Sequence, residues 1–201
     1  MPGGWTVAGV LAHMGYWDAR AIYWLDKWSR TGEPTPYEPE NVEAVNDAAK
    51  PLCLALRPRD AAQLALPVGS ATWPIWASAS HLAGMRVMWL CYVFKEPGGK
   101  TTAFGDLDLM ERGWEDDPEH PRGADELVDA LESSWRIVAR ALDTWTLDSL
   151  AREERRVRGT EVQFHTRQSV LYRMLTHDAY HISEISLTLG SHGLGEIDIW
   201  R

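Results

Sequence analysis

Apolar residues recur at steps of three and four along most of this chain, a spacing typical of amphipathic α-helices. The spacing predicts helices over residues 5–28, 42–56, 73–95, 124–145 and 166–189. Pro51 interrupts the second of these, and Gly190 ends the last, because glycine commonly follows a helix C-terminus. Residues 29–40 contain three prolines, so they are expected to form an extended loop.

β-Strand patterns are almost missing from the sequence. A short ribbon is expected within Arg155–Phe164, and the charged stretch Arg152–Arg158 is expected to be solvated. Residues 98–123 are rich in Gly, Pro, Asp and Glu, which predicts a long surface excursion of a kind that is often functional. The predicted fold class is all-α, a four-helix bundle with an additional N-terminal helix, and residues 1–201 are expected to form a single helical domain.

Composition and charge exclude several classes of protein. Lys and Arg number 20 against 29 Asp and Glu, a net charge of −9, so there is no basic surplus to bind nucleic acid. The 45% of hydrophobic residues is typical of a globular protein, and the longest uncharged stretch contains prolines that a membrane span tolerates poorly. Cys53 and Cys91 lack the spacing of a disulfide framework or a thiolate metal site. The sequence therefore favours a cytoplasmic protein that contacts no membrane.

His177 and His181 are the first candidates for chemistry. Their spacing of four places both imidazoles on one face of a helix, one turn apart, where both can reach one metal ion. Val170 and Met174 extend the same face, so the pair is expected to point into the bundle, where unpaired imidazoles would be costly. Glu184 follows on this face and is the candidate to orient a ligand, act as a base, or approach the metal itself, the alternative being a salt-bridged or solvent-facing carboxylate.

A third ligand would have to come from another helix, and His81 and His13 are the two candidates. Each follows a tryptophan by eight residues, Trp73 and Trp5 respectively, so residues 1–30 look like a partly duplicated helix. Three histidines would leave the fourth position of a tetrahedral ion open to water or substrate, which is the catalytic arrangement.

The other histidines and most of the tryptophans are expected to have structural roles. His120, His165 and His192 are expected to lie at the surface or to cap a helix. The tryptophans at helical spacing are interpreted as core residues, although Trp76 and Trp89 are also candidates to line a pocket above the metal.

The segments HLAGMRVMWL and TRQSVLYRMLTHDAYHISEISLTLGSHGL, in this order and spacing, resemble the DinB-like superfamily. This family of damage-inducible four-helix metalloproteins includes bacillithiol transferases and mycothiol-dependent maleylpyruvate isomerases. The resemblance is best over residues 73–201. It implies a four-helix bundle that holds zinc or nickel through His81, His177 and His181. The segment around His13 also resembles the family's first ligand motif, but the position of His81 fits the family order better.

The resemblance further implies a metal-dependent enzyme in which the ion activates a thiol or water. The expected reactions are thiol S-transfer or thiol-dependent isomerisation of a small molecule, with a low-molecular-weight thiol as cosubstrate and Glu184 as the candidate catalytic residue. Many family members are homodimers. The alternative is a non-catalytic stress-response helical protein that keeps the bundle and binds a metal or a small ligand.

Overall fold

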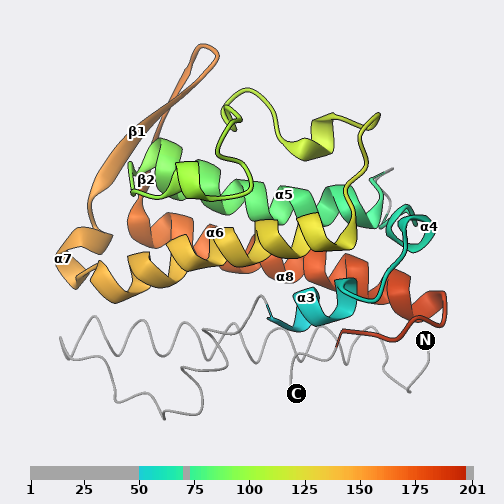
Figure 1. Cartoon of the computed structure of the whole chain (residues 1–201). Coiled ribbons are helices and arrows are strands. Elements are labelled where there is room, and N and C mark those ends of the chain that lie inside the picture. Colours follow the sequence, from blue (N-terminus) through green and yellow to red (C-terminus); the bar gives the residue numbers. More distant parts are fainter. Residues whose placement is uncertain (1–49, 70–72, 198–201) are drawn as a thin grey trace, which may run out of the picture. The chain divides into compact units, whose positions relative to one another are not determined.

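The computed structural model describes residues 50–69 and 73–197 (Figure 1). The chain divides into two compact units, Met1–Val45 and Asn46–Arg201. The described residues all belong to the second unit. The predicted helix at 5–28, the loop at 29–40 and His13 lie outside the described residues, and a single domain over 1–201 stays a prediction.

The described unit consists mainly of long helices, which confirms the mainly helical class (Figure 1). They are α5 (Ile75–Val87), α6 (Ala124–Thr144) and α8 (Arg167–Ser191), and the shorter α3 (Lys50–Leu56) packs on α6. The single-turn helices α4 (Ala61–Leu64) and α7 (Leu147–Leu150) lie in connections. The ends of α6 and α8 lie within two residues of the predicted ends, and α8 continues through Gly190 to Ser191 where the prediction ended it at 189.

Helix α5 is the central element, since it packs on both α6 and α8. Every residue of α5 is buried except His81 and Met85, which are half-buried and one turn apart. As predicted, one helical segment occupies most of residues 73–95. However, the α-helix widens into a π-helix at Met88–Val93 before the chain turns at Lys95, whose φ is +60°.

Helix α6 shows why an amphipathic pattern predicts a bundle helix well. Its N-terminus is capped by the Glu126 carboxylate, which accepts a hydrogen bond of 2.9 Å from the Gly123 backbone N–H. The buried stripe of α6 faces α5, and together with the apolar residues of α5 and α8 it forms one continuous core. Its buried apolar members are Leu127, Val128, Ala130, Leu131, Ile137, Val138 and Ala141.

The predicted ribbon is an antiparallel hairpin of β1 (Glu153–Arg158) and β2 (Glu161–Thr166). Successive side chains of a strand point to opposite faces. In β1 only Glu154 and Arg156 are half-buried, while the residues between and beside them are exposed. The expectation that the whole stretch Arg152–Arg158 is solvated is therefore wrong for these two side chains, because the strand turns one face toward the helices.

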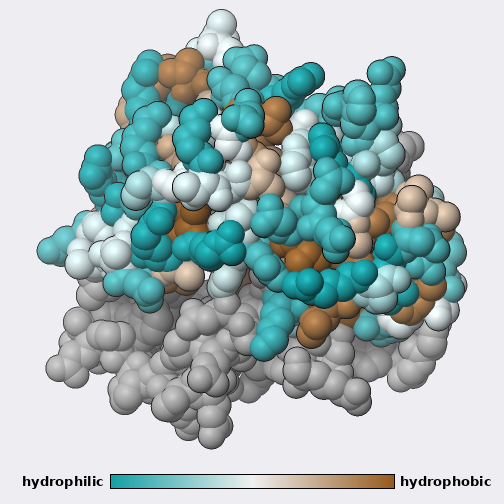
Figure 2. All heavy atoms as spheres, viewed as in Figure 1, coloured by the Kyte–Doolittle hydropathy of each residue, from teal (hydrophilic) through white to brown (hydrophobic). Residues whose placement is uncertain are grey.

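The visible surface of the described unit is mostly hydrophilic, with apolar side chains in scattered patches (Figure 2). Among the described residues, no helix has both the length and the apolar character that crossing a bilayer requires.

Candidate metal centre

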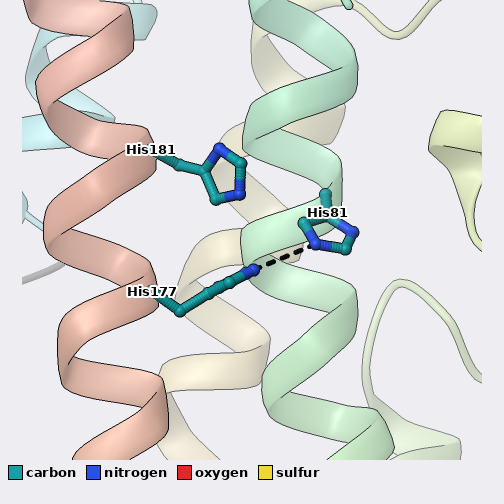
Figure 3. Close-up of side chains that lie close together, drawn as sticks. All are labelled: His81, His177 and His181. Atoms are coloured by element: carbon teal, nitrogen blue, oxygen red, sulfur yellow. Dashed lines mark hydrogen bonds between the residues drawn. The ribbon is translucent and has the colours of Figure 1, made fainter. Parts of the chain in front are cut away.

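Three histidines from two helices meet between α5 and α8 (Figure 3). His177 and His181 extend from α8 toward α5, and His81 extends from α5 toward them. One ring nitrogen from each lies within 4.8 Å of the other two. The predicted set His81, His177 and His181 is thus brought together, and it is compatible with a divalent metal ion. His13, the alternative first ligand, lies outside the described residues.

His81 is held by a carboxylate on one side and faces a histidine on the other. Its Nδ1 donates a hydrogen bond of 2.6 Å to Oε1 of Glu115, because a carboxylate only accepts. The lone pair of Nε2 then points toward Nε2 of His177, which is 3.0 Å away. Glu115 belongs to the 3₁₀ turn Trp114–Asp116 within the excursion at 98–123, and sequence reasoning missed this residue.

His181 has a similar partner on its own helix. Its Nδ1 donates a hydrogen bond of 3.0 Å to Oε2 of Glu184, one turn further along α8. This geometry leaves Nε2 of His181 available as a ligand atom. The other carboxylate oxygen of Glu184 lies against Gly69, where an added Cβ would come within 2.3 Å of Oε1. Of the three roles considered for Glu184, the hydrogen bond favours the orienting one.

Burial keeps the two α8 histidines neutral. Desolvation, followed by the nearby His81 and His181, lowers the pKa of His177 to about 4. Desolvation and His81 also lower the pKa of His181, although Glu184 opposes this shift. A metal ligand must be the neutral imidazole, so these environments prepare both side chains for coordination at neutral pH.

Trp73 covers one side of the cluster. Its indole centroid lies 5.0 Å from that of His81 and 6.5 Å from that of His181, nearly parallel to the latter ring. Trp76 and Trp89 are buried, which agrees with their interpretation as core residues. The side chains of His81 and His181 keep 18% and 13% exposure, so the cluster is not sealed from solvent.

An ion pair between buried Arg86 and half-buried Asp178 joins α5 to α8 beside the cluster. Arg86 Nη2 donates a hydrogen bond of 2.6 Å to Oδ2 of Asp178, the residue next to His177. The Arg86 side chain is only 2% exposed, and its guanidinium also lies 5.5 Å from the ring centroid of Trp135. This pair holds the backbone that carries His177 against the helix that carries His81.

The donor set suits a small divalent ion. Two imidazole nitrogens that share a tetrahedral ion, each bound at about 2.0–2.1 Å, lie roughly 3.3 Å apart. The separation of 3.0 Å between Nε2 of His81 and Nε2 of His177 is close to that value. Both carboxylate partners sit on Nδ1 atoms, as the outer partners of metal-bound histidines do.

Comparison with known families agrees with the fold and the cluster. The family model described as the DinB superfamily matches residues 52–185, about two thirds of the chain, which include all three histidines. The chain therefore belongs to the DinB superfamily. Neither the curated proteins nor the solved structures provide a match.

Proposed function

We propose that this protein is a metal-dependent enzyme in which His81, His177 and His181 hold one divalent ion, zinc or nickel. The observation that supports the proposal most strongly is the convergence of three imidazoles, two of which are oriented by carboxylates. A bound ion of this kind lowers the pKa of a coordinated thiol or water and so supplies a nucleophile at neutral pH.

Three further side chains have separate roles around that ion. Glu115 and Glu184 fix the tautomers of His81 and His181, so that both present Nε2. Trp73 shields one side of the cluster. A role for Glu184 as proton acceptor from an incoming thiol is part of the proposal, and its place next to His181 supports it.

The proposed reaction is thiol S-transfer or thiol-dependent isomerisation of a small molecule, with a low-molecular-weight thiol as cosubstrate. The resemblance to bacillithiol transferases and mycothiol-dependent maleylpyruvate isomerases supports it, and so does a three-ligand set that leaves a coordination position open. The same resemblance suggests a homodimer. The proposal places the enzyme in the cytoplasm, where free cysteines such as Cys53 and Cys91 are usual.

Cobalt substitution tests this function. Co²⁺ is loaded into the untagged protein, and cysteine, glutathione, bacillithiol and mycothiol are titrated separately while the near-ultraviolet spectrum is recorded. We expect a thiolate-to-cobalt charge-transfer band with at least one thiol, and no such band in the double variant His177→Ala, His181→Ala. If Co²⁺ binds but no thiol produces the band, the protein is better described as a non-catalytic binding protein.

A further inference from the structure

A second cluster, formed by Trp89, Arg156, His165 and Arg173, lies where the hairpin meets the π-helix Met88–Val93 and α8. Two guanidinium groups share the Trp89 indole: the Cζ atom of Arg156 is 4.7 Å from the ring centroid and that of Arg173 is 5.4 Å from it. The His165 ring meets the same indole edge-on at 4.7 Å. The cluster therefore concentrates positive charge around one aromatic ring.

This charge is not neutralised by the described residues. Among them, no carboxylate forms an ion pair with Arg156 or Arg173, and Nε of Arg156 is buried without a hydrogen-bond partner. Glu154 shares the inward face of β1 with Arg156, but its Oε1 lies 2.8 Å from Arg152 Nη2. Burial and the charges of Arg158 and Arg173 lower the pKa of Arg156. The two arginines thus repel each other in the absence of an anion.

Folding alone gives little reason for this arrangement. A single arginine stacked on Trp89 would dock the hairpin through a cation–π contact. A second cation on the same ring adds like-charge repulsion, which weakens the docked state. Clusters of like charge that lower the stability of the folded protein in this way are typical of binding sites.

The cluster lies beside the three-His cluster. Arg173 precedes His177 by four residues on α8, so the two side chains are neighbours one turn apart on the same helix. Trp89 follows His81 along the helical segment that begins with α5. The two clusters therefore share α8 and the helical segment that begins with α5.

We propose that the Trp89, Arg156, His165 and Arg173 cluster is an anion-binding site that holds a carboxylate or phosphate group of the substrate next to the metal centre. The assignment to a substrate rests on the proposed function, whereas anion binding as such does not. Guanidinium groups recognise both oxyanions through paired N–H donors, and the half-burial of Arg156 strengthens its attraction for an anion. The substrate class is then a small acid or phosphate ester.

The test is calorimetric titration of the untagged full-length protein with succinate, inorganic phosphate and the neutral analogue succinamide at low ionic strength. The variants are Arg156→Gln and Arg173→Gln. Arg155→Gln is the matched control, because it removes the same charge from an exposed residue of the same strand. Thermal unfolding of each variant is measured alongside, and Arg173→Gln remains informative if Arg156→Gln disturbs the hairpin, since Arg173 is exposed.

We expect succinate or phosphate to bind and succinamide not to bind, with the preferred anion identifying the substrate group. Loss of either arginine should weaken anion binding by about tenfold or more, and Arg155→Gln should change it less than about twofold. Equal weakening by all three variants, equal binding of succinamide, or no binding of either anion would overturn the proposal. The metal content of the same samples separates the two ideas: anion binding without metal contradicts the proposed function alone, and metal without anion binding contradicts this inference alone.

Discussion

Glu115 accepts a hydrogen bond of 2.6 Å from Nδ1 of His81, although the two residues are 34 positions apart in the chain. The glutamate comes from the irregular excursion between the π-helix and α6, and its side chain is only 11% exposed. One oxygen of its carboxylate contacts His81, and the other is buried without a hydrogen-bond partner. The excursion therefore contributes a carboxylate to the surroundings of the three-His cluster.

Removal of this carboxylate should weaken metal binding. In Glu115→Ala, His81 loses the partner that fixes its tautomer, and we expect the affinity for Zn²⁺ to fall by about 10- to 100-fold. Glu119→Ala, an exposed glutamate of the same excursion, is the control and should leave the affinity unchanged. Chelator competition measures both, and equal affinities for Glu115→Ala and the wild type would show that the hydrogen bond does not support the site.

Helix positions and the α8 histidine pair could be predicted because short-range periodicity determines them. The spacing of Val170, Met174, His177 and His181 identified the inward face of α8 correctly. The contacts of Glu115 and Trp73 could not be predicted, because they depend on how an irregular segment and a helix entry fold back onto α5. The inward face of β1 was missed because a run of arginines and glutamates has no apolar alternation to mark it.

Gly69 should be required for the position of Glu184. Gly69→Ala places a Cβ within 2.3 Å of Glu184 Oε1 at a residue whose φ is +58°. Gly159 has the same φ in the hairpin turn with open space around it, so Gly159→Ala isolates the backbone strain. Both variants should lose about 1–2 kcal/mol in the free energy of unfolding. Only Gly69→Ala should weaken metal binding, and an equal metal affinity in the two variants would refute this role.

The Arg86–Asp178 pair should contribute more to stability than an exposed ion pair does. Arg86→Met leaves the half-buried carboxylate of Asp178 without its partner, and we expect a loss of about 3 kcal/mol in the free energy of unfolding. Arg122→Ala breaks a far more exposed pair with Glu126 and should cost at most about 1 kcal/mol. Urea unfolding of both variants measures the difference. Adding Asp178→Leu to Arg86→Met should recover part of the loss, and similar costs for the two single variants would contradict the expected contribution.

Cys53 should be almost unreactive in the folded protein. Burial raises the pKa of its thiol to about 11, so little thiolate is present at pH 8. In a Cys91→Ser background, alkylation by iodoacetamide should be slow at pH 8 and should keep accelerating above pH 10. The folded state holds this proton more tightly than the unfolded state, so the thiol stabilises the fold below about pH 8.5, and the contribution is lost as pH rises toward 11. A rate that levels off near pH 9 would indicate an ordinary, accessible thiol.

The proposed function requires that His81, His177 and His181 bind one divalent ion, and the metal content of the untagged protein, measured by elemental analysis, shows whether they do. We predict one equivalent of zinc or nickel per chain, lost in the double variant His177→Ala, His181→Ala. The matched control His120→Ala, His192→Ala removes two exposed histidines outside the cluster and should keep the metal. A wild-type protein without stoichiometric metal, or a metal that survives the loss of His177 and His181, would contradict the proposal.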